Sequence, residues 1–198
     1  MKIGLTGSIA CGKSTVSSYL RELDYFVADA DAISHALTAP AGAALPALRE
    51  AFGDAVFSND MLNRQALGSL VFSDPAQRKK LNDILHPMII SQIHAELFSH
   101  DHPDTLVFGD IPLLYECSMA DMFDEVWVVS APRSVQIARL LARDGLSERE
   151  ASQRIDAQMP LEEKRRLADA VIHTDGPIED TRKQIRALLA AAISRRPK

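Results

Sequence analysis

The sequence predicts an α/β fold in which a five-stranded parallel sheet is flanked by helices. Short apolar segments alternate along the chain with segments whose apolar residues recur at helical spacing, as in sheets that are covered on both faces. A glycine-bounded loop joins the first apolar segment to the first helical one. Residues 32–103 are mostly helical and too many for a simple crossover, so we expect a helical insertion beside the ligand-binding edge of the sheet.

Each element is expected from its own local pattern. The strands are short apolar runs, at residues 2–6, 25–28, 106–108, 125–129 and 170–173. Helices are expected at residues 14–23, 43–52, 64–72, 75–85, 87–98, 132–143, 147–159, 160–168 and 178–193. Val16, Tyr19 and Leu20 give the first helix its apolar face. Asp74-Pro75 is typical of a cap followed by the first helical residue, and Ser147 with Glu150 forms a capping-box pattern.

Length and composition exclude several classes of protein. The 198 residues suit one α/β domain with insertions. The chain has no apolar run long enough to span a membrane, and it opens directly on a strand without signal-peptide architecture. Cys11 and Cys117 are far apart, which excludes a disulfide framework or a zinc site and fits a reducing cytoplasm. A net charge of −5 argues against nucleic acid as the main partner.

The strongest chemical signal is G-S-I-A-C-G-K-S at residues 7–14, which matches the phosphate-loop pattern G-x-x-x-x-G-K-[ST]. Its two outer glycines allow the sharp path that aims backbone N–H groups at one anion, and the following helix adds about half a positive charge. Lys13 can reach the β- and γ-phosphates, and the Ser14 hydroxyl can ligate Mg²⁺. We therefore expect a P-loop nucleoside triphosphate hydrolase fold. The expected nucleotide-binding residues are Gly7, Ala10, Cys11, Gly12, Lys13, Ser14 and Thr15.

Acidic residues follow two of the expected strands. Asp29 and Asp31 come just after the second strand, at the edge of an α/β sheet where ligands bind. A carboxylate there can accept the proton of an acceptor hydroxyl or position Mg²⁺, although Asp31 could instead cap the helix that begins at Ala32. Asp110 ends the third apolar run, where such enzymes place an acid that helps to hold Mg²⁺; an ordinary turn residue is the alternative.

A basic stretch lies late in a chain that is acidic overall. Residues 133–166 hold eight basic residues against six acidic ones. Arg139 and Arg143 are four apart, so they share one helix face. Beside a phosphate loop, this face suits a lid that neutralises charge during phosphoryl transfer, and a solvated helix face is the alternative. His86, followed by Pro87, is by itself best interpreted as a structural residue at a helix junction.

A series of motifs occurs in order along nearly the whole chain. The motifs are I-G-L-T-G-S-I-A-C-G-K-S-T-V at 3–16, D-A-D-A-I at 29–33, residues 81–87 ending in His86-Pro87, P-L-L-Y-E at 112–116, and the run from Q-I-A-R-L at 136–140 through Q-M-P at 158–160 to Lys164. In this combination and spacing the chain resembles dephospho-coenzyme A (dephospho-CoA) kinases. The resemblance implies transfer of the γ-phosphoryl group of ATP to the ribose 3′-hydroxyl of dephospho-CoA, the last step of coenzyme A synthesis.

The resemblance also implies roles for individual residues. Lys13 and Ser14 match the ATP-phosphate and Mg²⁺ positions, and Asp31, the second acid of D-A-D, matches the catalytic base. His86 falls in the acceptor-side helical region, so Asp31 and His86 are expected to contact the acceptor. Arg139 or Arg143 falls where the lid arginine is expected. Within a single kinase domain over 1–198, the acceptor-binding region is then expected at about 32–103 and the lid at about 139–165.

The phosphate loop departs from the usual family sequence, and other classes of nucleotide-binding protein remain as alternatives. The family loop usually reads G-G-I-G-[SA]-G-K-S, whereas this chain has Ser8 and Ala10 in place of two glycines. A shikimate- or gluconate-type kinase could also carry the loop and paired acids, but the Gly-Gly-Gly loop of shikimate kinases is absent at 109–116. An adenylate-kinase-like enzyme would lack the D-A-D element. A nucleotide-dependent switch of the GTPase type would need an N-K-x-D element, which the chain lacks.

Overall fold

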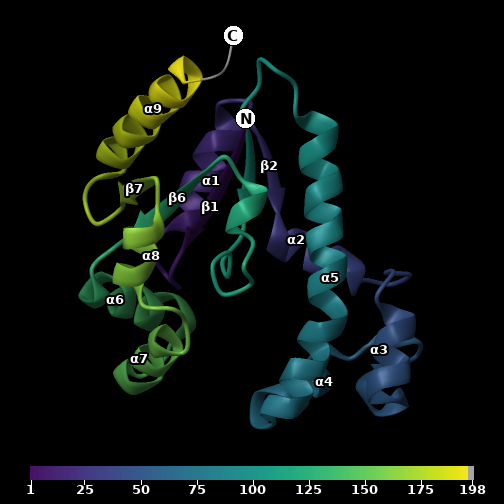
Figure 1. The fold of residues 1–198 in the computed structure, drawn as a ribbon. Helices are drawn as coiled ribbons and strands as arrows, with labels where there is room; N and C mark the ends of the chain where they lie inside the picture. Colours follow the sequence, from purple (N-terminus) through teal and green to yellow (C-terminus); the bar gives the residue numbers. More distant parts are fainter. Residues whose placement is uncertain (196–198) are drawn as a thin grey trace. The chain divides into compact units, whose positions relative to one another are not determined.

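The structure is a computed structural model that describes residues 1–195, apart from the side chains at positions 72 and 73. It divides into two compact units, of which one is formed by Met1–Ala28 with Leu97–Lys198 and the other by Asp29–Glu96 (Figure 1). The predicted five-stranded sheet forms within the first unit. Its strand β2 ends at Asp29, which is the first residue of the second unit.

The sheet has the strand order β2-β5-β1-β6-β7. Its strands are β1 Lys2–Gly7, β2 Phe26–Asp29, β5 Val107–Asp110, β6 Glu125–Ser130 and β7 Ala170–His173. Strand β1 is central and runs parallel to both neighbours, with Leu5 opposite Asp110 of β5 and Trp127 of β6. This strand order brings the carboxyl ends of β1 and β5 side by side. The phosphate loop and Asp110 therefore share one edge of the sheet.

The predicted helices of the first unit form close to their expected positions, and a short 3₁₀ turn at Ala120–Met122 was not predicted. They are α1 Lys13–Glu22, the 3₁₀ turn η2 Ala120–Met122, α6 Arg133–Asp144, α7 Glu148–Asp156, α8 Leu161–Leu167 and α9 Ile178–Ser194. Val16 and Leu20 bury the predicted apolar face of α1. The predicted capping box of α7 is confirmed, because the Ser147 hydroxyl accepts from the Glu150 N–H while the Glu150 carboxylate accepts from the Ser147 N–H at 2.9 Å.

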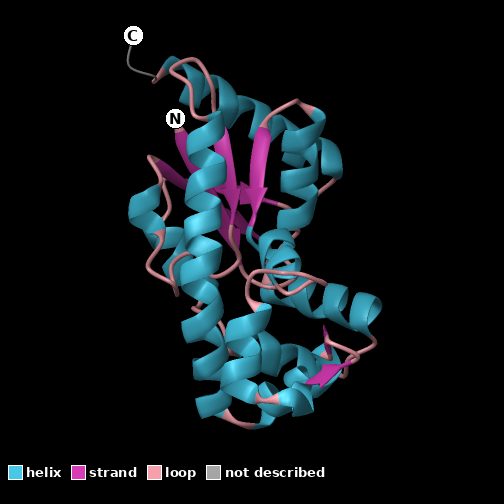
Figure 2. Ribbon diagram, turned by 90° about the vertical axis from the view of Figure 1, so that its right-hand side faces the viewer, coloured by secondary structure: helices cyan, strands magenta, loops and turns pink. Residues whose placement is uncertain are grey.

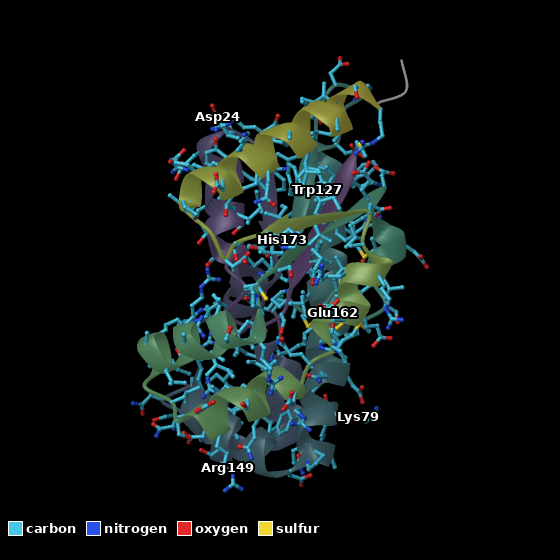
Figure 3. The ribbon with its side chains drawn as sticks, turned by 90° about the vertical axis from the view of Figure 1, so that its left-hand side faces the viewer. Asp24, Lys79, Trp127, Arg149, Glu162 and His173 are labelled. Carbon is cyan, nitrogen blue, oxygen red and sulfur yellow. The ribbon has the colours of Figure 1, made fainter. Side chains whose placement is uncertain are left out.

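A continuous apolar core joins the sheet to α1 and α9. Leu5, Leu20, Trp127 and Ile185 are fully buried in it. The rings of Phe108 and Trp127 meet edge to face, with their centroids 5.6 Å apart. Figure 3 shows Trp127 beneath α9, which covers one face of the sheet. A close-packed core resists deformation, so the strand ends above it form a rigid base for the phosphate loop.

The second unit is mainly helical. Its elements are α2 Ala30–Leu37, α3 Leu45–Phe52, the 3₁₀ turn η1 Asp54–Val56, the hairpin strands β3 Phe57–Ser58 and β4 Met61–Leu62, α4 Arg64–Ser73 and most of α5 Pro75–His100. The predicted start of α5 is confirmed, since the Asp74 carboxylate accepts from the Ala76 N–H at 2.8 Å.

The expectation of two separate helices at 75–85 and 87–98 was wrong. One helix, α5, runs for 26 residues with Pro87 inside it. A proline removes one helical hydrogen bond and crowds the carbonyl four residues earlier, but long helix-favouring segments on both sides can retain the helix across that single defect. No helix within residues 1–195 has both the length and the apolar character that crossing a membrane requires.

The sequence analysis also missed the hairpin formed by β3 and β4, which is drawn in magenta in Figure 2. Asn59 and Asp60 connect its strands with φ angles of 50° and 60°. Two successive residues with positive φ are typical of a type I′ turn, and Asn and Asp tolerate this conformation better than most residues. The Asn-Asp pair was therefore the available signal, although two-residue strands are too short to show alternation.

Candidate active site

The phosphate loop follows β1 and leads directly into α1. A β-carbon added at Gly7 would lie 2.7 Å from the Val129 carbonyl oxygen, so close packing against β6 requires glycine there. Gly12 has φ 83° and is the N-cap residue of α1. Between them Ala10 also takes a left-handed conformation, with φ 59°. The loop thus has the backbone path expected of its motif, but one of its left-handed positions is occupied by a residue with a β-carbon.

The N-terminus of α1 is available to an anion. No side chain of the described residues caps this helix, and its first turn contains no acidic residue. The first N–H groups of a helix have no carbonyl partner within it, and the helix dipole makes this end positive. By contrast, α2 and α7 are capped by side-chain oxygens. What distinguishes α1 is its place directly after the phosphate loop, where an uncapped helix start can bind a ligand such as phosphate.

Lys13 and Asp110 form an ion pair at the carboxyl edge of the sheet. The Asp110 side chain is only 4% exposed, and that of Lys13 is 17% exposed. The two residues come from adjacent strands, since Lys13 follows the loop after β1 and Asp110 ends β5. Lys13 was predicted to bind phosphate and Asp110 to help hold Mg²⁺. The structure brings both together in one polar cluster.

Helix α6 holds the loop through two side chains one turn apart. Arg139 donates to the Ala10 carbonyl at 3.1 Å and to the Thr174 carbonyl at 2.5 Å. Gln136 donates to the Ile9 carbonyl at 2.7 Å. The Thr174 hydroxyl, from the segment after β7, donates to the Cys11 carbonyl at 2.6 Å. No role was predicted for Gln136, although it opens the Q-I-A-R-L motif, or for Thr174, because polar residues on a helix face or after a strand carry no local sign of a distant partner.

The two arginines expected in the lid have different surroundings. Arg139 is held against the loop by the contacts above. Arg143 is exposed, and its guanidinium binds the carboxylate of Asp144 with contacts of 2.7 and 3.0 Å. Arg154 binds the same carboxylate at 3.2 Å. Hydrogen bonding between Arg143 and Asp144 raises the pKa of the arginine and lowers that of the carboxyl group. Arg139 thus already contacts the loop, while Arg143 and Arg154 form a surface cluster around one acid.

Gln158, between α7 and α8, also contacts the loop. Its side-chain oxygen accepts from the Ser8 hydroxyl at 3.0 Å and from the Ile9 N–H at 2.8 Å. Ser8 therefore makes a contact that a glycine at this position could not make. Gln158 belongs to a motif used in the resemblance, but no role was predicted for it.

An open cavity of about 550 Å³ borders this contact. Ser8 and Gln158 line it together with residues of the segments 130–133, 155–162 and 173–175. Figure 3 labels His173 and Glu162, which both belong to its wall. The hydrogen bond between Ser8 and Gln158 therefore forms part of the boundary between the cavity and the phosphate loop.

Cys11 is fully buried within the loop. Burial raises the pKa of its thiol, and this effect exceeds the lowering caused by backbone hydrogen bonds, Arg139 and Lys164. The thiolate is the reactive form of cysteine, so burial keeps Cys11 in its unreactive form. Cys11 is thus best understood as a small residue that fits the loop.

The D-A-D segment lies where β2 meets α2. The Asp29 carboxylate accepts from the N–H groups of Asp31 at 3.0 Å and of Ala32 at 3.1 Å. Asp29 is therefore the N-cap of α2, and the alternative in which Asp31 caps this helix was wrong. Asp31 is exposed in the first turn of α2, and His86 lies inside α5. Both belong to the unit Asp29–Glu96, whereas the phosphate loop belongs to the other unit.

Side chains suited to a metal ion are few. Among residues 1–195, no group of three or more His, Cys, Asp and Glu side chains could hold a metal. Mg²⁺ in phosphoryl-transfer enzymes takes one or two protein ligands and completes its octahedron with phosphate and water oxygens. The Ser14 hydroxyl at the start of α1 and the Asp110 carboxylate have the oxygen chemistry that such a site requires.

Comparisons with known proteins agree on one family. A family model described as dephospho-CoA kinase matches residues 1–180. A dephospho-CoA kinase from Symbiobacterium thermophilum is 47% identical over 193 residues, which cover 96% of this chain and 80% of that protein. Another, from Carboxydothermus hydrogenoformans, is 44% identical over 190 residues, which cover 94% of this chain and 92% of that protein.

Solved structures confirm the predicted fold class. A protein from Thermus thermophilus is 38% identical and matches with a TM-score of 0.82 over 96% of this chain and 97% of its own. The dephospho-CoA kinase from Campylobacter jejuni is 28% identical, with a TM-score of 0.73 over 98% of each chain. A shikimate kinase from Acinetobacter baumannii, at 18% identity, has a TM-score of 0.57 over 100% of this chain and 95% of its own. That likeness shows a common fold and nothing of the acceptor.

Proposed function

Because the chain belongs to the dephospho-CoA kinase family, we propose that it transfers the γ-phosphoryl group of ATP to the ribose 3′-hydroxyl of dephospho-CoA. The reaction yields ADP and coenzyme A and is the final step of coenzyme A synthesis. The family match over residues 1–180 carries this proposal. The anion-binding geometry of the phosphate loop supports its ATP-binding half.

The loop backbone and Lys13 bind the triphosphate in this proposal. N–H groups at the start of α1 would donate to the phosphates, and the helix dipole would attract them. Lys13 must leave its ion pair with Asp110 to reach the β- and γ-phosphates. The released Asp110 carboxylate, together with the Ser14 hydroxyl, would then hold Mg²⁺, which neutralises negative charge on the phosphates. Mutual neutralisation of Lys13 and Asp110 thus stabilises the site until the nucleotide arrives.

Asp31 is the proposed base. Its exposed carboxylate does not cap α2, because Asp29 performs that task. In the transfer step, the 3′-oxygen forms a bond to the γ-phosphorus while its proton passes to Asp31. The bond between the γ-phosphorus and the bridging oxygen breaks, and ADP carries away the electron pair. His86 and the helical region at about 32–103 would bind the acceptor, and the region at about 139–165 would act as the lid.

Arg139 and Arg143 would stabilise charge on the transferring phosphoryl group as the lid closes. A closed lid excludes water, so ATP is not lost to hydrolysis. Only small molecules are needed as partners. We propose that the reaction occurs in the cytoplasm, which agrees with a chain whose two cysteines, Cys11 and Cys117, are not joined by a disulfide.

An ADP-release assay with different acceptors tests this function. We expect dephospho-CoA to stimulate ADP release strongly, and shikimate, gluconate and AMP to leave it near the slow rate seen without acceptor. Lys13→Ala should fold normally yet lose roughly 10²–10³-fold in turnover, because the lysine charge acts on the transferring phosphoryl group. Equal stimulation by shikimate or AMP would reject the acceptor assignment. Near wild-type turnover in the folded Lys13 variant would reject the catalytic site.

A further inference from the structure

A lysine is buried behind the phosphate loop. Lys164, on α8, has a side chain that is 0% exposed. Its ammonium group donates to the Gly7 carbonyl at 3.3 Å and to the Pro112 carbonyl at 3.2 Å, and it pairs with the Glu116 carboxylate at 2.8 Å. A buried ammonium is strongly unfavourable unless it is paired and hydrogen-bonded, and these three partners match its three donors.

The two carbonyls mark the two halves of the proposed catalytic edge. Gly7 is the last residue of β1 and the first of the phosphate loop. Pro112 lies two residues after Asp110, the last residue of β5. The Thr6 hydroxyl also donates to the Pro112 carbonyl, at 3.1 Å. One ammonium group therefore links the segment that leads to Lys13 with the segment that carries Asp110.

The counterion of Lys164 extends this link to the segment between α7 and α8. The Glu116 carboxylate also accepts from the Met159 N–H at 3.1 Å. The preceding residue, Gln158, binds Ser8 and Ile9. Residues 158–164 thus contact the start of the phosphate loop at two points. One contact is made by the Gln158 side chain and the other by the Lys164 ammonium group.

We infer that Lys164, with Glu116 as its counterion, is a positioning residue for phosphoryl transfer. It fixes the distance between the start of the phosphate loop and the end of β5, and thereby the placement of Lys13 relative to Asp110. Lys164 does not touch the reacting atoms, because its donors are occupied by Gly7, Pro112 and Glu116. The inference rests on the proposed function and assigns a role to a residue outside the phosphate-loop motif.

The test compares Lys164→Met and Glu116→Gln with a control that weakens the fold elsewhere. Lys164→Met keeps an unbranched side chain of similar bulk but lacks the charged terminal nitrogen, and Glu116→Gln keeps an acceptor for the Met159 N–H. The control is Leu189→Ala, a core residue of α9. Arg195, the residue that follows that helix, pairs with Glu125 at the start of β6, the sheet edge opposite the loop. All variants are assayed well below their melting temperatures.

Two readouts separate positioning from stability. Hydrogen exchange of the amides from Ile9 to Gly12 should become faster in Lys164→Met and Glu116→Gln but not in Leu189→Ala. The kcat with dephospho-CoA should fall by about tenfold to 10²-fold in both variants, since small misplacements of catalytic groups have effects of this size. Leu189→Ala should stay within about threefold of the wild-type kcat.

Unchanged loop exchange in both variants, together with a kcat near the wild-type value, would overturn the inference and leave Lys164 as a stabilising residue only. Failure of the proposed function has a different signature, because the wild-type protein itself would then show no stimulation by dephospho-CoA. In that case the loop-exchange comparison still decides whether Lys164 positions the phosphate loop.

Discussion

Asp29 and Asp31 are two residues apart and have different tasks. The Asp29 carboxylate accepts two backbone N–H groups as the cap of α2. The Asp31 carboxylate is exposed in the first turn of the same helix. The Asp29 carboxylate is held against the start of α2 by these two N–H groups, so it is less able to reorient toward an acceptor hydroxyl. The capping geometry therefore favours Asp31 over Asp29 as the base.

This division of tasks predicts opposite phenotypes for the two acids. Asp31→Asn should reduce kcat by about 10²–10⁴-fold, the range typical of general bases, with little change in melting temperature or ATP affinity. Asp29→Ala should reduce the free energy of unfolding by about 0.5–2 kcal/mol through loss of the cap. Turnover and thermal unfolding are measured on the same preparations. A stable, fully active Asp31→Asn variant would exclude Asp31 as the base.

Ala10 carries local strain in the phosphate loop. Its φ of 59° is unfavourable for a residue with a β-carbon and unrestricted for glycine. We expect Ala10→Gly to raise the free energy of unfolding by about 0.5–1.5 kcal/mol, measured by urea denaturation. The control is Ala187→Gly in the middle of α9, exposed and helical, which should lower stability by about 1 kcal/mol. A destabilised Ala10→Gly variant would show that the alanine methyl group makes a compensating contact.

At the scale of elements, α6 connects the loop to the proposed lid. Its first half contacts the loop through Gln136 and Arg139. Its last turn carries Arg143, which with Arg154 surrounds Asp144. Exposed pairs of this kind contribute little to stability, so Arg143 can exchange its partner for a phosphate at small cost. Arg139, by contrast, links the loop to the segment after β7.

This difference predicts separable effects of the two arginines. Arg139→Ala should lower both melting temperature and kcat, because the loop loses contacts at Ala10 and Thr174. Arg139→Lys should reach neither the melting temperature nor the kcat of the wild type, since a single ammonium group cannot reproduce the forked contact of a guanidinium. Arg143→Ala should lower kcat more than it changes KM for the acceptor, with the melting temperature unchanged. If neither alanine variant loses turnover, the basic stretch is a solvated face and the lid chemistry lies elsewhere.

The elements show which features a local pattern can predict. The helix start at Asp74-Pro75, the capping box at Ser147 and the loop at residues 7–14 are encoded by neighbouring residues, and all three form as predicted. The continuity of α5 through Pro87 depends on how much helix lies on either side, so the proline alone was misleading. The short hairpin at residues 57–62 is defined by its turn rather than by its strands.

The candidate active site also contains residues that a local motif can predict and residues that it cannot. The motif predicted the loop and Lys13, because the chemistry of phosphate binding lies within eight consecutive residues. The residues that hold the loop in place come from more than 100 positions away, and they include Gln136, Gln158, Lys164 and Thr174. Their contacts depend on the tertiary fold: Gln136, Gln158 and Lys164 fall within the motif run that carried the family resemblance, but that run did not indicate what they contact. A single sequence therefore gives the reacting groups more readily than the groups that position them.

At the scale of the whole molecule, alkaline pH should weaken the fold through groups that are buried in their neutral form. The Tyr115 hydroxyl is buried and has no hydrogen-bond partner within the described part of the chain. Burial, assisted by the negative charge of Asp169, raises its pKa from about 10 to about 12. Burial also raises the pKa of the thiols of Cys11 and Cys117. In each case the folded protein retains a proton that the unfolded chain releases at lower pH.

The sign of the effect follows from proton binding. Below pH 10 the Tyr115 phenol is protonated in both states, and its contribution to stability is fully present. Between about pH 10 and pH 12 the unfolded chain ionises first, so this contribution declines as pH rises.

Tyr115→Phe removes the ionising group and an unpartnered buried hydroxyl. The variant should therefore match or exceed the wild-type melting temperature at pH 7 and lose less of it between pH 10 and pH 12. Tyr25→Phe provides a matched tyrosine control in the same unit. Melting curves of all three proteins across this range decide the point: if Tyr115→Phe and wild type lose stability equally, the Tyr115 hydroxyl ionises as readily in the folded protein as in the unfolded chain.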